Sequence, residues 1–325
     1  MPLMQADRLE VLVVVDNVTD VLSSTPPFVT RETTRMLRRG ISPTTGAAFC
    51  CAAHGLSLVI TAHGPGGART MMFDGGPTDS AMETNAARLG VDFGAIDAVT
   101  LSHGHWDHAG GIPHALAMIR AADGNRPIPL FLHPAMFQQR GLGMPDGGVL
   151  PADAFPTPNE WAGLGAVPIV TTDPATCLDD MFFISGEIPR LTDYEKGLEQ
   201  QVRRAAADAP WEPEPAVIDE RFLAVHVRNK GLVVFSGCSH AGIVNVLHHA
   251  GVCFPGVRLH AVMGGFHLAG TTEAIIPATV NDLRGFGLDH IIAGHCTGWR
   301  AIAALERAFG DQVVVPSAVG KLFSL

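Results

Sequence analysis

The segment that most restricts how this chain can fold is a histidine-rich loop directly after an apolar run. Residues 103–108 are His-Gly-His-Trp-Asp-His, and they lie between the apolar stretch 98–101 and a Gly-Gly pair at 110–111. Four side chains that can bind a metal ion thus fall within six residues. They cannot all face one point from a regular strand or helix, so the sequence predicts a buried strand that ends in a tight loop, followed by a helix.

This segment, named here the histidine loop (residues 103–108), has the composition of a metal site. His103 and His105 are two residues apart and can hold one cation, while Asp107 and His108 turn toward a second cation nearby. Imidazole and carboxylate groups are ligands of zinc, and a catalytic zinc site leaves one position open for water. A surface loop that is rich in histidine by accident is a much poorer explanation of this pattern after a buried strand.

Apolar, β-branched runs of strand length recur along the chain. They predict strands at 9–15, 56–61, 70–73, 98–101, 129–132, 167–170, 181–184, 222–227, 232–235, 259–263, 291–293 and 313–315. Helical patterns lie between them, at about 80–89, 111–121, 194–206, 243–250, 274–286 and 301–309. The Asn-Lys-Gly sequence at 229–231 predicts a hairpin turn. Many strands with interspersed helices predict two packed sheets with helices outside them.

Size and charge narrow the class of protein further. The chain has 325 residues, of which 47% are hydrophobic, so it can bury one large core or two modest ones. Its formal net charge is -10, without a long run of Lys or Arg, which argues against a nucleic-acid partner. The apolar run near the N-terminus has only the length of a strand, so we expect neither a leader peptide nor a membrane span. The six cysteines lack the spacing of a disulfide scaffold, and a cytoplasmic protein is expected.

The histidine loop resembles the His-x-His-x-Asp-His signature of the metallo-β-lactamase superfamily. The Phe-Asp-Gly-Gly sequence at 73–76 is similar to the first motif of that superfamily. Segments 16–17, 185–190, 236–243, 264–268 and 294–298 resemble one branch, the 7,8-dihydropterin-6-ylmethyl-4-(β-D-ribofuranosyl)aminobenzene 5′-phosphate synthase-like proteins. The resemblance runs over nearly the whole chain. It implies an α/β fold, the four-layer αββα sandwich, as a single domain over residues 1–325 with loop-rich insertions at about 134–180 and 190–220.

The resemblance also implies a centre of two divalent metal ions, with Zn²⁺ expected and Mn²⁺ or Fe²⁺ as alternatives. In addition to the four ligands of the histidine loop, each ion needs a later histidine. His240, His267 and His295 all follow expected strands, and we favour His240 and His295 as ligands. His267 is either a ligand or an acid/base that faces the substrate. Asp74 is expected to orient a ligating histidine, as metal-bound imidazoles require.

One departure from the superfamily pattern concerns the second half of the site. Members often have an aspartate that bridges the two metals at a Gly-Asp strand end, whereas this chain has Gly237-Cys238. The Cys238 thiolate coordinates, or His240 takes over, or a water alone bridges the ions. Free cysteines are among the most buried residue types, so a small buried hydrophobic side chain is the favoured interpretation of Cys238. The other histidines, including His54, are expected to have surface or hydrogen-bonded core roles.

These observations predict that the protein is a metal-dependent hydrolase of a small, phosphorylated or ester-type substrate. Asp107 is expected to accept a proton from a metal-activated water, and His267 to donate one to the leaving group. Arg190, Arg300 and Trp106 are candidate substrate contacts. The alternatives are a transferase of the synthase type named above and a non-catalytic, metal-dependent binding or sensor protein. The expected partner is a small molecule, with a homo-oligomer left open.

Overall fold

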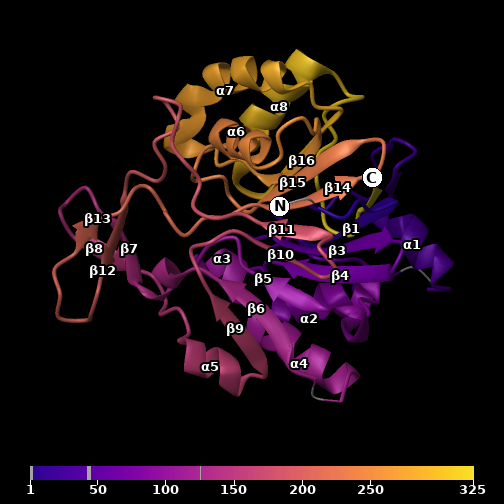
Figure 1. Cartoon of the computed structure of the whole chain (residues 1–325), viewed down its shortest axis with the longest axis horizontal. Helices are drawn as coiled ribbons and strands as arrows, with labels where there is room; N and C mark the ends of the chain where they lie inside the picture. The colour runs from indigo at the N-terminus through magenta and orange to yellow at the C-terminus, as the bar shows by residue number, and fades with distance from the viewer. Residues whose placement is uncertain (1–2, 42–44, 125) are drawn as a thin grey trace.

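The computed structural model describes residues 3–41, 45–124 and 126–325. Two large β-sheets lie face to face, and helices cover the outer face of each (Figure 1). The predicted αββα sandwich is therefore confirmed. None of the helices in the described ranges has both the length and the apolar character needed to span a bilayer.

The first sheet has the strand order β2-β18-β1-β3-β4-β5-β6-β9. Neighbouring strands from β2 to β4 are antiparallel, and those from β4 to β9 are parallel. The helices α2, α4 and α5 lie against its outer face, and α1 lies near its edge (Figure 1). The bounds of these elements are β1 (Arg8–Val15), β2 (Val29–Thr30), β3 (Ser57–Gly64), β4 (Gly67–Phe73), β5 (Ala98–Thr100), β6 (Ile128–Leu132), β9 (Ala166–Val170), β18 (Leu322–Ser324), α1 (Glu32–Arg38), α2 (Asp79–Leu89), α4 (Ile112–Ala122) and α5 (Pro158–Gly163).

The second sheet has the strand order β10-β11-β14-β15-β16-β17, and its last three strands are parallel. The predicted hairpin joins β14 to β15, where Val227 pairs with Gly231 and Asn229 adopts a φ of 61°. The helices α6, α7 and α8 cover its outer face (Figure 1). The bounds are β10 (Ala175–Cys177), β11 (Phe182–Ile184), β14 (Leu223–Val227), β15 (Gly231–Ser236), β16 (Leu259–Gly265), β17 (His290–Gly294), α6 (Ile243–Cys253), α7 (Ile276–Leu283) and α8 (Trp299–Phe309).

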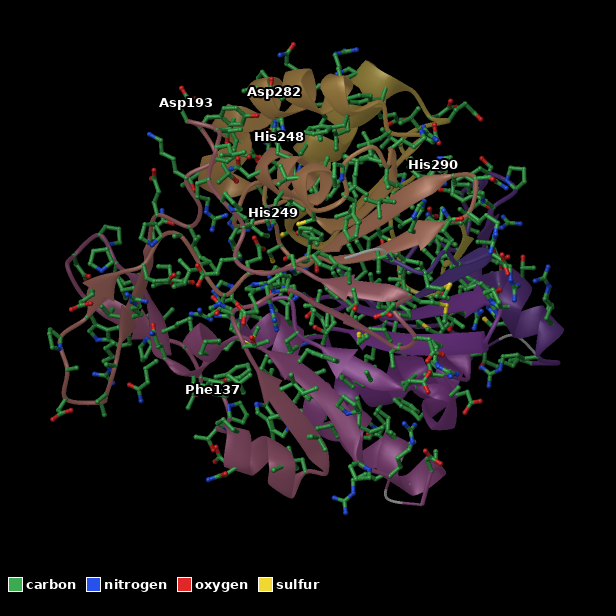
Figure 2. The ribbon with its side chains drawn as sticks, viewed as in Figure 1. Phe137, Asp193, His248, His249, Asp282 and His290 are labelled. Carbon is green, nitrogen blue, oxygen red and sulfur yellow. The ribbon has the colours of Figure 1, made fainter. Side chains whose placement is uncertain are left out.

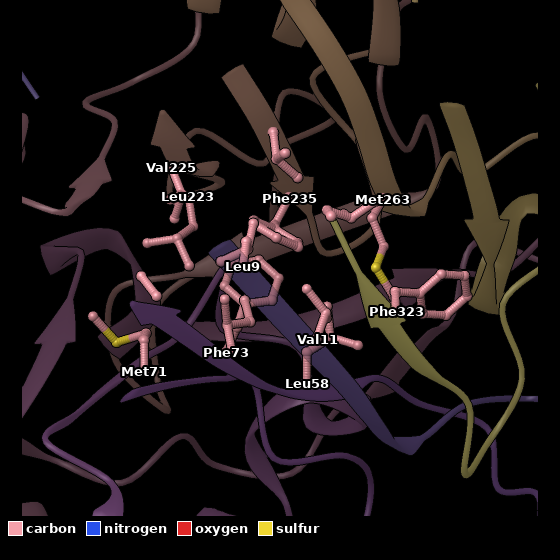
Figure 3. Close-up of a cluster of buried hydrophobic side chains, with 14 of the residues drawn as sticks. Leu9, Val11, Leu58, Met71, Phe73, Leu223, Val225, Phe235, Met263 and Phe323 are labelled. Atoms are coloured by element: carbon pink, nitrogen blue, oxygen red, sulfur yellow. The ribbon is translucent and has the colours of Figure 1, made fainter. Parts of the chain in front are cut away.

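Three apolar layers hold the sandwich together. Between the sheets, Leu9 and Val11 of β1 pack with Phe73, Phe235 and Met263 (Figure 3). Successive side chains of a strand point to opposite faces, so the next residues along β1 contribute to the layer under α2 and α4 instead. A third layer lies under α6, α7 and α8. Burial of each large apolar side chain stabilises the fold by about 1.5–3 kcal/mol.

A small sheet, β13-β12-β7-β8, lies beside the sandwich, at the left of Figure 1. It is built from β7 (Gln139–Gly143), β8 (Val149–Pro151), β12 (Gln201–Arg204) and β13 (Glu212–Pro213), which fall in the segments 134–180 and 190–220. The helix expected at 194–206 was wrong, because β12 pairs with β7 and this tertiary pairing outweighs the local helical pattern. The strand expected at 313–315 is reduced to one isolated bridge between Val314 and Ile291.

Candidate metal centre

The candidate ligands converge because they follow strands whose carboxyl ends lie at the same edge of the sandwich. The histidine loop leaves β5 and runs into the short helix α3 (Trp106–Ala109). Cys238 and His240 follow β15, His267 follows β16, and His295 comes directly after β17. The ligands therefore come from both sheets of the sandwich. By contrast, His248 and His249 belong to α6 and His290 opens β17 (Figure 2).

The first ligand group consists of His103, His105 and His240, whose ligand atoms lie within 4.8 Å of one another. Nε2 of His103 is 3.0 Å from Nδ1 of His105, and the ring centroid of His240 is 4.9 Å from those of both. His240 is 3% exposed, and neither of its ring nitrogens has a hydrogen-bond partner among the described residues. Buried polar atoms are normally satisfied, so this orphaned imidazole fits a cation ligand.

The second ligand group consists of Asp107, His108, Cys238 and His295, again with ligand atoms within 4.8 Å of one another. Oδ2 of Asp107 is 3.7 Å from Nε2 of His108 and 3.3 Å from Nε2 of His295. The structure thus brings together all six residues that were expected to bind metal, in two adjacent groups. The second group also contains Cys238, for which the sequence left coordination open but favoured a buried hydrophobic role.

Buried polar partners fix the orientation of two ligand rings in the histidine loop. Nδ1 of His108 donates a hydrogen bond to Oδ2 of Asp74 at 2.7 Å. Ser102 Oγ donates to the same Asp74 oxygen at 2.8 Å and accepts from Nδ1 of His103 at 2.9 Å. The Nε2 atoms of both rings then face the ligand groups. Second partners of this kind set the tautomer and raise the basicity of a ligating imidazole.

The rings of His295 and His105 are also held by polar partners. Nδ1 of His295 donates to Oδ1 of Asn17 at 3.0 Å, which leaves its Nε2 for the second group. Nε2 of His105 donates to the side-chain oxygen of Gln201, the first residue of β12, so its Nδ1 faces His103. Gln201 was not expected from the sequence, because its segment was assigned to a helix.

A buried acidic pair connects the two loops that carry ligands. Oδ2 of Asp219 accepts the backbone N–H of Gly104 at 2.8 Å, inside the histidine loop. The next residue, Glu220, accepts the backbone N–H of His240 at 2.8 Å. Asp219 is also paired with the buried guanidinium of Arg140. Neither carboxylate has a motif around it that would have predicted this role.

Four of the nine non-glycine residues with a positive φ in the described ranges lie at the site. These residues have φ angles in the left-handed region, which residues other than glycine usually avoid. The angles are 60° for Asp74, 58° for Ser239, 42° for His267 and 47° for His295. Such conformations cost of the order of 1–3 kcal/mol each and persist where the surroundings hold them, typically at functional sites. Their clustering supports a functional role for this edge of the sandwich.

The protonation states of the first group suit metal binding. Burial lowers the pKa of His105 to about 4, and it lowers the pKa values of His103 and His240 well below that of free histidine. These rings are therefore neutral near pH 7 and carry a free lone pair. The neutral imidazole is the form that coordinates a cation.

In the second group, the pKa values of His108 and Asp107 depend on their charged neighbours. Burial opposes the charged form of His108, but the carboxylates of Asp107 and Asp74 raise its pKa to about 9. Burial likewise opposes ionisation of Asp107, yet the His108 and His295 imidazoles lower its pKa below the usual range for a carboxyl group. Asp107 is therefore a carboxylate near neutral pH. With imidazole, carboxylate and thiol donors, the residues present fit a borderline-soft ion such as Zn²⁺.

Members of both groups line a cleft of about 510 Å³, namely His105, Asp107, Cys238, His240 and His295. Trp106, which is 49% exposed, and His267 both line this cleft, as expected for residues that face a substrate. His54 also lines it, and its Nε2 lies 3.5 Å from Oδ2 of Asp107, although the sequence favoured a surface or core role. A lone histidine 53 residues before its partner carries no local signal.

The two candidate arginines are placed away from the cleft lining. Arg190 donates to the backbone carbonyl of Ala216. Arg300 lies on the outer surface, where it forms an ion pair with Glu273 at 3.1 Å and stacks on the ring of Trp299 at 4.4 Å. Both side chains are engaged with other partners, and neither lines the cleft.

Comparison with known proteins agrees with this geometry. The family model of the metallo-beta-lactamase superfamily matches residues 54–134, which contain the histidine loop. A 7,8-dihydropterin-6-methyl-4-(beta-D-ribofuranosyl)-aminobenzene-5′-phosphate synthase of Methanocaldococcus jannaschii is 31% identical over 256 residues, which are 76% of this chain and 82% of that protein. An uncharacterized protein of the same organism is 25% identical over 79% of this chain and 88% of its own length.

Solved structures show the same fold. Tm1679, a metal-dependent hydrolase of the beta-lactamase superfamily, aligns with a TM-score of 0.70 and 22% identity over 98% of this chain and 99% of its own. YhfI from Bacillus subtilis, a metallo-beta-lactamase fold protein, aligns with a TM-score of 0.51 and 12% identity over 98% of this chain and 100% of its own. The sequence relatives and the fold together show that the chain belongs to the metallo-β-lactamase superfamily.

Proposed function

We propose that this protein is a metal-dependent hydrolase that uses two divalent ions, with Zn²⁺ favoured, to cleave a small ester-type substrate. The observation that carries the proposal is that two ligand groups lie side by side and that members of both line an open cleft. Such a pair of ions, when bound, activates water near neutral pH and polarises the oxygen under attack. The free cysteines of the described chain agree with a cytoplasmic location, which we also propose.

The residues around the ions supply the proton transfers. Asp107 is ionised and lines the cleft, so its carboxylate can accept a proton from the attacking water. His267 lines the same cleft, with its ring centroid 4.5 Å from that of His240. Its Nδ1 is buried and has no hydrogen-bond partner in the described part of the chain. Because the ring lines the cleft, we assign it the role of proton donor to the leaving group.

The cleft lining favours an ester with an apolar group over a polyanionic substrate. Leu142 of β7 and Leu150 of β8 are 42% and 58% exposed, and both line the cleft. Exposed apolar side chains that gather at a cleft are typical of ligand-binding surfaces. Among the described residues of the lining, the one Lys or Arg is Arg140, and its charge is paired with Asp219. The substrate's remote part is thus apolar.

The test starts from protein stripped of metal by a chelator and reloaded with Zn²⁺. We expect the reloaded protein to hydrolyse members of a panel of lactones, thioesters and phosphodiesters, and the stripped protein to be inactive. His103→Ala should abolish turnover, whereas His248→Ala, a change on α6 outside both ligand groups, should not. The hydrolase proposal would be contradicted if the protein turned over no panel member but did turn over a phosphoribosyl donor.

A transferase of the synthase type is the second candidate, favoured by the 31% identity to the Methanocaldococcus jannaschii synthase. A phosphorylated substrate would need a cation. Lys196 lines a smaller hollow of about 110 Å³, which shares His240 and His267 with the main cleft. Under this alternative, Lys196→Ala abolishes synthesis of the product named for the relative. Under the hydrolase proposal, the same change leaves ester cleavage intact.

A further inference from the structure

We propose that Cys238 is the fourth protein ligand of the second ion, so that this ion would have four protein ligands and no free coordination position. The ion in the three-histidine group would keep one free position, which is where water and substrate would bind. This inference rests on the two-metal centre of the proposed function. It does not depend on the reaction that the centre carries out.

Four of the six distances among the donors of the second group are near the edges of one tetrahedron, and all six are within 4.8 Å. The Sγ of Cys238 lies 3.1 Å from Nε2 of His108 and 3.2 Å from Nε2 of His295. Two further edges join Oδ2 of Asp107 to the same nitrogens, at 3.7 and 3.3 Å. For zinc bonds of about 2.0–2.1 Å to nitrogen or oxygen and about 2.3 Å to sulfur, tetrahedral edges are about 3.3–3.6 Å. The four donors therefore already lie near the separations that a single ion imposes.

The surroundings of Cys238 differ from those of a cysteine that only fills space. It is 3% exposed, and its sulfur contacts two imidazole nitrogens. It also lies within 4.8 Å of the ligand atoms of His240 and His267, so the sulfur is on the side of the second group that faces the first. An apolar side chain at this position would leave the second group with three protein donors, from Asp107, His108 and His295.

The first group is different, because the described residues give it three histidines and no fourth protein donor. Both groups border the cleft, the first through His105 and His240 and the second through Asp107, Cys238 and His295. The smaller number of protein donors is therefore what leaves a position of the first group open to water and substrate. Sites with four protein ligands are typically structural, and those with three are typically catalytic. A thiolate ligand also favours Zn²⁺ over harder ions such as Mn²⁺.

The test replaces the native ions with Co²⁺ in the full-length protein. We expect two Co²⁺ per chain and a thiolate-to-cobalt charge-transfer absorption. Cys238→Ser should abolish this absorption and keep the d–d bands of the ion in the three-histidine group. Cys296→Ser is the matched control, because the Cys296 sulfur contacts the Cys238 carbonyl oxygen at 3.5 Å but belongs to neither ligand group. It should keep the absorption.

A second variant covers the case in which Cys238→Ser does not fold. Cys238→Asp offers a carboxylate in place of the thiolate, and it should retain two Co²⁺ without the charge-transfer absorption. Two bound ions in the wild type without that absorption, or an absorption that survives Cys238→Ser, overturn the inference alone. A wild-type protein that binds no ion overturns both it and the proposed function. Charge transfer without any hydrolysis supports the inference and counts against the hydrolase.

Discussion

Asp74 holds His108 by a hydrogen bond of 2.7 Å between two fully buried side chains, 34 residues apart in the sequence. The same carboxylate accepts the backbone N–H of Ser102 at 2.7 Å through its other oxygen. Asp74 thus fixes both the start of the histidine loop and the ring of one ligand. Its backbone has a φ of 60°, which asparagine tolerates better than most residues.

Asp74→Asn should therefore keep the backbone and weaken the centre. We expect the affinity for Zn²⁺ to fall about 10–100-fold, because the amide is a poorer partner for the His108 imidazole than a carboxylate. Competition with a chromophoric chelator measures this. Asp208→Asn, an exposed change between β12 and β13, should leave the affinity unchanged. Equal affinities for the two variants would show that Asp74 does not orient the ligand.

Arg140→Met should destabilise the protein strongly. The change leaves the carboxylate of Asp219 buried without its guanidinium partner, which typically costs about 3–5 kcal/mol. Chemical denaturation of the metal-free protein measures the loss in the free energy of unfolding. The double variant with Asp219→Asn should recover most of the loss, since no unpaired charge remains. A single variant with the wild-type midpoint would contradict this account.

Leu150→Asp should raise KM for substrates with long apolar groups and have little effect on the shortest ester. The expected factor is about 10-fold, which corresponds to roughly 1.4 kcal/mol of lost apolar contact. Steady-state kinetics over a series of increasing chain lengths measures it. Val252→Asp, on an exposed position of α6, is the matched control. A rise in KM that is the same for every chain length would argue against an apolar subsite.

His267→Gln separates two roles that the sequence left open. If His267 is the proton donor, kcat should fall about 100- to 10,000-fold while two ions remain bound. Metal content by elemental analysis, measured beside the kinetics, makes the distinction. Loss of one ion in the variant would make His267 a ligand, in agreement with its place within 4.8 Å of Cys238 and His240.

The parts of the site that the sequence predicted are those with a local pattern. The histidine loop is contained in six residues, and His240 and His295 each follow an apolar strand, which marks them as residues at a strand exit. The positions of most of the expected strands and helices follow from apolar periodicity in the same way. These features depend on neighbours along the chain, so a single sequence carries them.

The features that were missed depend on contacts between distant segments. Arg140 and Asp219 are 79 residues apart, and nothing near either residue marks the ion pair. The segment of β12 has a helical pattern, but its pairing with β7 decides its conformation. For Cys238, burial alone predicted a hydrophobic role, and only the folded chain places its sulfur between two imidazoles.

The ligands are divided between the two halves of the sandwich, since His103 and its neighbours follow the first sheet while Cys238, His240 and His295 follow the second. A cation that occupies either group therefore ties the halves to each other across their shared edge. Such an ion stabilises only the assembled chain, by an amount that grows with its free concentration. The supply of metal would then add to the stability of a sandwich already held by its apolar core, as well as decide whether the cleft is active.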